Sequence, residues 1–456
     1  MADSPVARLR EVEAEILART PEHDLTPTLE RIQAVVELMD DPQRSFPLVH
    51  VTGTNGKTST TRMIERLLRE FGLRTGRFTS PHLHDVRERI AFDGVPISPE
   101  RFVAAYDEVL PYLQVVDARS AEAGKPMLSY FEVLVAMAYA AFADAPVDVA
   151  VVEVGLGGEW DATNVADGQV SVVTPIALDH ERFLGSTTIE IATEKRGIIK
   201  PGGFAVIAQQ DVDVAEILLE KVAEVGATVA REGLEFGVLS REVALGGQQV
   251  SLRGLAGDYE DLFLPLYGPH QAGNAACALV AVEAFLGAGD QPLNSERVLT
   301  AFADMSSPGR LEVVRRSPTV IVDAAHNPAG AQALVDAVEE AFGFRRLIGV
   351  VAILADKDAR GMLEVLEPIL DEVVLTRTTS SRALDPEDLG AVAAQVFGAD
   401  RVHVEALLPN ALELAVTLAE AGGEDRTSDG LGGIGVLATG SVTTAAEVRL
   451  LLGAER

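Results

Sequence analysis

The feature of this sequence that most constrains its fold is the repeated alternation of short apolar runs with segments of helical periodicity. The runs are rich in β-branched residues, which is typical of strands buried on both faces of a parallel sheet. Helices must then cover both faces of that sheet. The sequence therefore predicts an α/β fold with a mostly parallel sheet. The runs in the first half of the chain are residues 47–51, 147–155, 170–178 and 204–208.

The pattern changes twice further along the chain. Between residues 233 and 267 the segments are short and separated by Gly-containing turns, which predicts a small antiparallel patch. After a turn-rich, basic stretch the alternation starts again as a second unit. We predict a large α/β domain over residues 1–308, a linker over 309–318 and a smaller Rossmann-like domain over 319–456, with a surface loop at 421–433. The strands expected in the second domain are residues 319–325, 346–354, 372–377, 401–405 and 433–440.

Composition excludes several classes of protein. Lys and Arg number 38 against 69 Asp and Glu, so the formal net charge is −31 and a broad nucleic-acid or anionic-membrane surface is disfavoured. Cys277 is the only cysteine, which rules out an intrachain disulfide and a Cys-based zinc site. No apolar run approaches the length of a membrane span, and the N-terminal residues lack an apolar signal core. We expect a water-soluble protein of the cytoplasm.

The strongest local motif is VTGTNGKTS at residues 51–59. A strand that leads through a Gly-rich turn into a helix directs backbone N–H groups and the positive end of the helix at a phosphate. Lys57 would reach the terminal phosphates of a nucleotide, and Thr58 or Ser59 would lie near a magnesium ion. The alternative is an ordinary strand-to-helix turn. The residues expected to contact the nucleotide are Gly53, Thr54, Asn55, Gly56, Lys57, Thr58 and Ser59.

The GTNGKT spelling resembles the Mur ligase superfamily of ATP-dependent amide-forming ligases. Further motifs resemble one branch of it, the folylpolyglutamate synthases/dihydrofolate synthases, in the order of that family from about residue 30 to 450. The large domain is therefore expected to be a P-loop, Mur-ligase-like domain. The motifs are TSPHL at 79–83, SYFE at 129–132, VVEVGLGGEWDATN at 151–164, ALDH at 177–180, EKRGI at 194–198, GPHQAGNAA at 268–276, SPGRLE at 307–312, DAAHNP at 323–328 and ATGS at 438–441.

Amide formation through an acyl phosphate sets the chemistry that the site needs. Negative charge gathers between ATP and the carboxylate, so lysines and magnesium ions must stabilise it. Ser80, Glu153 and His180 each lie near the end of an apolar strand or in the loop beyond it, and the carboxyl ends of parallel strands are where ligands bind. A carboxylate inside VVEVG is costly to bury without a cationic partner. By the resemblance, Ser80 and Glu153 hold a first magnesium ion and His180 belongs to a second.

Lys195 lies in a predicted helix, where a lysine is ordinarily a solvated charge. The resemblance implies that this lysine is carbamylated and that the resulting anion supports the second magnesium ion. Carbamylation needs a neutral amine, so the site must lower the pKa of the lysine or stabilise the product. K⁺ is a further candidate cation. Together Lys57, His180 and Lys195 are the expected catalytic residues.

The resemblance also implies contacts with the pterin substrate. Tyr130 and Phe131 match a pair of aromatics beside the pterin, although an aromatic pair opening a helix also suits core packing. Glu159 stands where the family usually has Arg, and Arg196 where it usually has a small residue. The first departure bears on substrate preference, and the second stands next to Lys195. The residues expected at the pterin are Ser129, Tyr130, Phe131, Trp160, Asp161 and Ala162.

The second domain is expected to close over the site. By the resemblance, Asn274 contacts adenine, Arg310 the phosphates and Asp323 the ribose, while His326 and Ser441 lie in the region of the incoming glutamate. Arg310 taken alone is equally an exposed linker arginine. Closure would exclude water from the acyl phosphate.

The predicted activity is ligation of L-glutamate to a pterin acid by a monomeric enzyme with Mg-ATP. Dihydropteroate would give dihydrofolate, and a reduced folate would give folylpolyglutamate. Three alternatives remain: a sister Mur-type ligase with another acid substrate, a P-loop NTPase without ligase activity, and an inactive paralogue.

Overall fold

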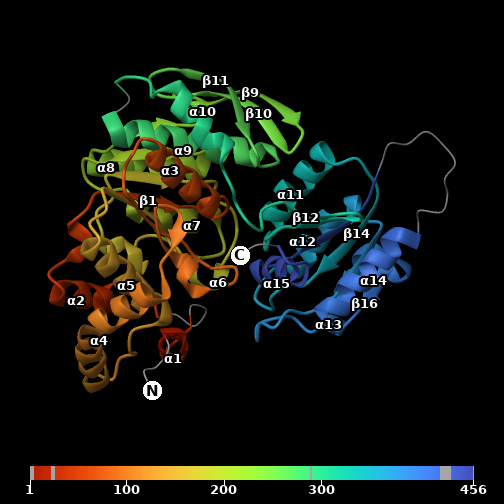
Figure 1. The fold of residues 1–456 in the computed structure, drawn as a ribbon, viewed down its shortest axis with the longest axis horizontal. Helices are drawn as coiled ribbons and strands as arrows, with labels where there is room; N and C mark the ends of the chain where they lie inside the picture. The colour runs from red at the N-terminus through yellow and green to blue at the C-terminus, as the bar shows by residue number, and fades with distance from the viewer. Residues whose placement is uncertain (1–4, 22–25, 288–289, 422–432, 455–456) are drawn as a thin grey trace.

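The computed structural model describes residues 5–21, 26–287, 290–421 and 433–454 (Figure 1). Of the surface loop predicted at 421–433, residues 422–432 lie outside these ranges. None of the described helices is both long enough and apolar enough to cross a membrane. Two α/β units, each with its own sheet, lie side by side, the second one blue in Figure 1.

An eight-stranded sheet forms the centre of the large domain. Its strand order is β4-β3-β2-β5-β1-β6-β7-β8. The strands from β2 to β8 along this order run parallel. At one edge, β3 pairs antiparallel with β2, and β4 pairs antiparallel with β3. The predicted mostly parallel sheet is thereby confirmed. The strands are β1 (Leu48–Thr52), β2 (Thr75–Phe78), β3 (Ile90–Phe92), β4 (Val95–Pro96), β5 (Val149–Glu153), β6 (Val170–Val173), β7 (Phe204–Ile207) and β8 (Thr228–Arg231).

Helices cover both faces of this sheet because successive strand residues point to opposite sides. In β1, Val49 and Val51 enter the core beneath α3 and α9, while Leu48 enters the core beneath α5. Helices α3 (Lys57–Glu70), α9 (Pro269–Gly287) and α10 (Ser295–Ala303) share the first face. The helices associated with the other face are α1 (Pro5–Leu17), α2 (Glu30–Leu38), α4 (Pro99–Glu122), α5 (Tyr130–Asp144), α6 (Glu181–Leu184), α7 (Thr188–Lys195) and α8 (Val212–Val225).

The predicted antiparallel patch is also confirmed. Strands β9 (Gly237–Ala244), β10 (Gly247–Arg253) and β11 (Asp258–Leu264) form a separate sheet in the order β11-β10-β9. This sheet packs on α9 and α10, at the top of Figure 1.

The second domain is a six-stranded sheet in the order β12-β13-β17-β14-β15-β16, parallel except for β12. Its predicted strands are all present. The strands are β12 (Glu312–Arg316), β13 (Thr319–Val322), β14 (Phe344–Val351), β15 (Glu372–Leu375), β16 (Val402–Val404) and β17 (Gly433–Thr439). The helices are α11 (Pro328–Ala341), α12 (Ala359–Leu366), α13 (Pro386–Phe397), α14 (Leu408–Ala421) and α15 (Val442–Leu451).

The linker predicted at 309–318 needs correction, because β12 occupies most of it. Residues 312–316 pair antiparallel with β13 as the edge strand of the C-terminal sheet. An edge strand has one side open to solvent, so its arginines can stay exposed while its backbone is paired. A strand of this kind is therefore hard to distinguish from a basic linker in the sequence. The connection between the two domains is therefore the segment 304–311, between α10 and β12.

Candidate active site

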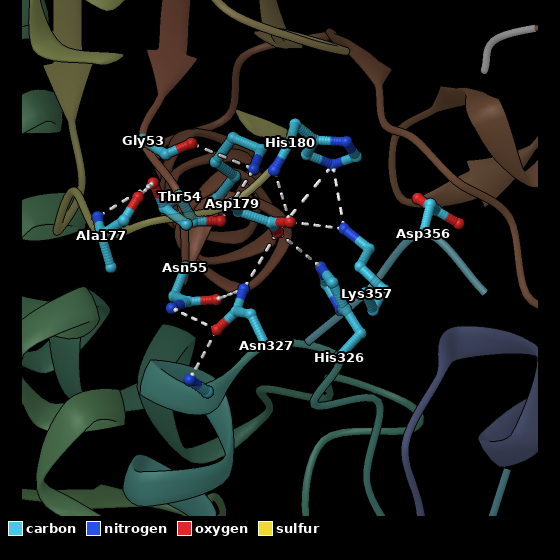
Figure 2. Close-up of polar contacts among 12 residues, drawn as sticks. Gly53, Thr54, Asn55, Ala177, Asp179, His180, His326, Asn327, Asp356 and Lys357 are labelled. Atoms are coloured by element: carbon cyan, nitrogen blue, oxygen red, sulfur yellow. Dashed lines mark hydrogen bonds and ion pairs between the residues drawn. The ribbon is translucent and has the colours of Figure 1, made fainter. Parts of the chain in front are cut away.

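A cavity opens where the carboxyl ends of β1, β5 and β6 face the loops of the second domain. Figure 2 shows that side chains from both domains point toward one another here. This is the edge at which open parallel sheets bind ligands. The cavity is lined by Gly53, Thr54, Lys57, Val154, Gly155, Leu156, Gly157, Asp179, His180, Leu184, Lys195 and His326.

The turn between β1 and α3 has the shape that its glycines permit. Gly53 and Gly56 have φ values of 138° and 89°, and a Cβ on Gly53 would lie 1.9 Å from the Thr174 hydroxyl oxygen. The Thr54 hydroxyl donates to the Ala177 carbonyl and accepts from the Ala177 N–H, each at 3.0 Å. The turn is therefore locked against the loop after β6 before any ligand binds.

Lys57 is the first residue of α3 and lies folded onto this turn. Its Nζ donates to the carbonyl oxygens of Gly53 at 3.1 Å and Thr54 at 3.0 Å. Burial lowers the pKa of the amine, although Glu153 and Asp179 oppose that shift. Backbone carbonyls are weak partners for an ammonium group, so an anionic phosphate would compete for it effectively.

Lys195, at the end of α7, is buried rather than solvated. Its Nζ donates to the same Gly53 carbonyl oxygen at 2.7 Å, and only 4% of the residue is exposed. Burial, assisted by the charge of Lys57, lowers the pKa of Lys195 to about 7. A neutral amine is therefore accessible near neutral pH, as carbamylation requires.

Oxygen groups gather at the end of β5. The Thr58 hydroxyl donates to Glu153 Oε1 at 2.8 Å, and the Ser80 N–H donates to Glu153 Oε2 at 3.3 Å. Burial raises the pKa of Glu153. No group of three or more His, Cys, Asp or Glu side chains in the described ranges forms a ready-made metal cage. Magnesium usually takes one or two carboxylates together with phosphates and water, so this oxygen set fits it.

Of the two hydroxyls that the sequence placed near magnesium, only Thr58 contacts Glu153. Ser59 instead lies 3.0 Å from the Ser307 hydroxyl and 3.5 Å from the Gln271 amide. Gln271 accepts a hydrogen bond from Asn274, whose side chain lies against Gly56. Asn274 is thus next to the Gly-rich turn, as a nucleotide contact would require.

Asp179 is the centre of the contact between the domains (Figure 2). Its carboxylate accepts from Lys357 Nζ at 2.5 Å and Asn327 Nδ2 at 3.0 Å, and it lies 3.3 Å from His326 Nε2. Burial would raise its pKa, but the bond from His326 and the nearby cations hold it well below its usual range. His180, 3.4 Å from Lys357 Nζ, has a pKa lowered to about 3, mainly by burial.

Sequence reasoning missed Asp179, Asn327 and Lys357. Each had a signal: Asp179 and Asn327 stand beside predicted residues in ALDH and DAAHNP, and Lys357 is one of six lysines in the chain. Asn327 also exchanges amide hydrogen bonds of 3.2 and 3.3 Å with Asn55. The predicted nucleotide residue Asn55 is therefore engaged with the second domain.

The remaining predicted residues of the second domain shape its loops. Asp323 accepts from the N–H groups of Leu311 at 2.8 Å and Ala325 at 2.7 Å, which fixes the turn that carries Arg310. Burial raises the pKa of Asp323. Ser441 caps α15 by accepting from the Thr444 N–H and is itself buried.

At the predicted pterin side, the aromatic pair is mostly buried. Phe131 packs 5.7 Å from Phe78, ring centroid to centroid, and against Gly155, which lines the cavity. The Arg89 guanidinium lies 5.2 Å from the centroid of the Tyr130 ring. Ser129 caps α5 in a reciprocal capping box. Of these residues, Phe131 lies directly behind the cavity, because it packs against Gly155.

The loop after β5 carries the other predicted pterin residues. Trp160 is half-buried, whereas Asp161 and Ala162 are buried. The Trp160 N–H donates to Glu194 at 3.1 Å. Of the two departures from the family pattern, Glu159 is exposed, and the Arg196 guanidinium lies 3.7 Å from the Glu220 carboxylate of α8.

The sequence is similar to known proteins along most of its length. Residues 309–427 match the family model described as "Mur ligase, glutamate ligase domain". The chain is 50% identical to the dihydrofolate synthase/folylpolyglutamate synthase of Mycobacterium tuberculosis, over 98% of this chain and 94% of that protein. It is 34% identical to the protein of the same name from Bacillus subtilis, over 80% and 84%.

Solved structures show the same likeness. The M. tuberculosis folylpolyglutamate synthase complexed with ADP has a TM-score of 0.94 and 48% identity, covering 99% of this chain and all of that one. A folylpolyglutamate synthase from Thermotoga maritima has a TM-score of 0.81 and 30% identity, covering 99% and 98%. The chain therefore belongs to the dihydrofolate synthase/folylpolyglutamate synthase family of Mur-type ligases.

Proposed function

We propose that this protein uses Mg-ATP to join the α-amino group of L-glutamate to the carboxyl group of a pterin acid. Dihydropteroate would give dihydrofolate, and a reduced folate would give folylpolyglutamate. The observation that carries the proposal is the convergence of Lys57 and Lys195 on the Gly53 carbonyl, beside Glu153. Two buried amines next to a buried carboxylate suit phosphoryl transfer between two anions.

The first half of the reaction moves the γ-phosphoryl group of ATP onto the carboxylate, giving an acyl phosphate and ADP. Lys57 exchanges its two backbone carbonyls for phosphate oxygens and stabilises their charge. Arg310, on the turn that Asp323 fixes, would reach the phosphates from the second domain. Asn274 would lie beside the adenine.

The second half is attack of the glutamate amine on the acyl carbon. Phosphate leaves with the C–O bonding pair, and the amine loses a proton. His326 and Ser441 would orient glutamate from the second domain, while the loop of Trp160 to Ala162 and the Tyr130–Phe131 pair would hold the pterin.

Magnesium would neutralise the charge of the transferred phosphoryl group. Thr58, Ser80 and Glu153 would hold one ion through hard oxygen atoms, and His180 with a carbamylated Lys195 would support a second. The lowered pKa of Lys195, about 7, supports the carbamate because CO₂ reacts with a neutral amine.

The deciding experiment is glutamate-dependent ADP release by the purified protein with Mg-ATP. Dihydropteroate and tetrahydrofolate are offered separately, and the products are identified by mass. A glutamate adduct on either acid is expected, and the ratio of adducts gives the balance of the two activities. If ADP is released at the same rate without glutamate and no adduct forms, the result would favour an NTPase. If the protein is inactive with both acids, the result would favour another acceptor acid or an inactive paralogue.

Three finer points of this proposal have their own tests. K⁺ is the proposed monovalent cation, and replacing it with Na⁺ in the same assay measures its contribution. A monomer is proposed, and light scattering after gel filtration measures the mass. A cytoplasmic location stays a prediction from the sequence.

A further inference from the structure

A buried chain of side chains links β1 to the loop of residues 154–165. His50 lies in β1, just before the Gly-rich turn, whereas Thr163 and Asp161 lie in the loop. His50 Nε2 is 2.9 Å from Thr163 Oγ1, and Thr163 Oγ1 is 2.5 Å from Asp161 Oδ1. His50 and Thr163 have no exposed surface, and Asp161 is 3% exposed.

The hydrogen bonds of this chain run in one direction. Burial raises the pKa of Asp161 to about 6, so at pH 7 and above the carboxylate only accepts. Thr163 must then give its hydroxyl hydrogen to Asp161, which leaves its oxygen to accept from His50 Nε2–H. Burial lowers the pKa of His50 to about 3, so the ring is neutral and its Nδ1 carries no hydrogen.

The His50 Nδ1 atom is buried and has no hydrogen-bond partner among the described residues. An unpaired buried acceptor costs stability. Leucine would fill much of the same space without that cost. The imidazole is therefore best explained by the bond that its other nitrogen makes to Thr163.

The chain ends on a carboxylate that ties both ends of the loop together. Asp161 also accepts from the Leu156 N–H at 2.8 Å and the Thr163 N–H at 2.9 Å. The Tyr139 hydroxyl of α5 donates to the Thr163 carbonyl at 2.7 Å. Leu156 lines the cavity, and Trp160 lies between the two tied ends.

We propose that His50 and Thr163 are positioning residues whose hydrogen bonds to Asp161 fix the 154–165 loop in the shape that receives the pterin acid. This inference rests on the function proposed above for the identity of that ligand. Neither His50 nor Thr163 needs to touch the substrate, because both act through the loop. Loss of the Thr163 hydroxyl removes the link, since it takes the donor from Asp161 and the acceptor from His50.

The first measurement needs no substrate, because Trp160 is the only tryptophan of the chain and lies within the loop. In the folded Thr163→Val protein we expect Trp160 emission at longer wavelength and about twofold stronger quenching by acrylamide, as for a locally opened segment. Thr163→Ser keeps the hydroxyl and should resemble the wild type. Thr376→Val is the matched control, because Thr376 is equally buried, lies in the other domain and has a hydroxyl without a hydrogen-bond partner in the part of the chain that the structure describes.

The second measurement is steady-state kinetics. Thr163→Val should raise the KM for the pterin acid about tenfold and leave the KM for ATP within about twofold, because only the loop is misplaced. His50→Leu should act like Thr163→Val, whereas His50→Gln, whose amide can donate near the Nε2 position, should retain most of the wild-type KM.

Unchanged Trp160 emission and quenching in Thr163→Val would overturn the inference, and so would equal increases in the KM for ATP and for the pterin acid. If Thr163→Val does not fold, the comparison of His50→Leu with His50→Gln carries the same test. If the wild type forms no glutamate adduct, the proposed function fails. The fluorescence comparison would still decide whether the hydrogen bonds of His50 and Thr163 hold the loop in place.

Discussion

The two domains meet at a centre and at a rim, and the two contacts differ in burial. At the centre, the Asp179 and Lys357 side chains are 7% and 6% exposed. At the rim, Arg241 of β9 forms a two-pronged ion pair with Glu340 of α11, and these side chains are 19% and 33% exposed. Tyr267 and Phe342 pack beside the rim, with ring centroids 5.0 Å apart.

The difference in burial predicts different roles for the two contacts. A charge left unpaired at the centre is largely shielded from water, whereas a charge left unpaired at the rim is solvated. The contact at the centre also borders the cavity, which Asp179 and His326 line. The centre should therefore dominate activity and stability, and the rim should matter little for either.

The largest effect is expected for Lys195→Ala, which removes a buried amine from the cavity that Asp179 also lines. We expect kcat to fall about 10²–10³-fold, as for loss of a group that stabilises transition-state charge. Short carboxylates added to the assay should restore part of the activity if the native group is a carbamate. Lys221→Ala, on the surface of α8, is the matched control. Full activity of Lys195→Ala without added carboxylate would remove this residue from the mechanism.

The next effect is on stability, from Asp179→Ala. Lys357 would be left buried without its counter-ion, which costs about 3–5 kcal/mol in the free energy of unfolding. Urea unfolding measures the change. In Asp179→Ala/Lys357→Met the loss should be smaller than the sum of the two single losses, because the stranded charge is gone. Strictly additive losses would show that the pair does not couple the domains.

Asp161 gives a contrast with Asp179. Both carboxylates are buried, but the pKa of Asp161 is raised, whereas the pKa of Asp179 is lowered. The pKa of Asp161 rises from the usual 3.8 to about 6, chiefly through burial, and Lys195 opposes the rise. The native state thus binds the extra proton, so this contribution to stability is present below pH 3.8 and is lost as pH rises through 6.

The measurement is the difference in unfolding free energy between the wild type and Asp161→Asn at several pH values. It should decline by about 2–3 kcal/mol between pH 4 and 7, following the size of the pKa shift. Of the other titratable groups near this carboxylate, His50 and Tyr139 stay neutral across that range, with pKa values lowered to about 3 and raised well above 10. Lys195, whose pKa is lowered to about 7, stays mostly protonated up to pH 6 and begins to lose its proton only at the upper end of the range. A constant difference would mean that Asp161 is ionised throughout.

The smallest effect is expected at the rim. Arg241→Gln should cost less than about 1 kcal/mol, and the cost should shrink further in 1 M salt, as for a partly solvated ion pair. Activity should stay within about twofold of the wild type. A loss as large as that of Asp179→Ala would reverse the ranking of the two contacts.

Most of the fold was predictable because buried parallel strands carry continuous apolar runs that few other structures share. The strand β12 was missed because an edge strand keeps polar residues on its solvated side and reads as a linker. The Gly-rich turn was predictable because glycine is needed there for two reasons. Gly53 and Gly56 adopt positive φ values, and a turn of this kind directs backbone N–H groups at a phosphate.

Other parts of the site could not be predicted from local pattern. The burial of Lys195 depends on the turn that α7 packs against, so the helical pattern alone suggested a surface charge. The joining of Asp179 to Lys357 and Asn327 depends on how two domains dock, which no local pattern encodes. The inward direction of the Asp161 carboxylate is likewise a property of the folded loop.

The short connection at residues 304–311 limits how the second domain can move. Because β12 is part of the C-terminal sheet, that domain is joined to α10 by a pivot rather than by a long tether. Gly309, within the pivot, already lies against Leu83 and Ala445. The second domain would therefore stay at a high effective concentration beside the cavity if the two domains moved apart. Cutting the chain at the pivot would turn that intramolecular encounter into a bimolecular one.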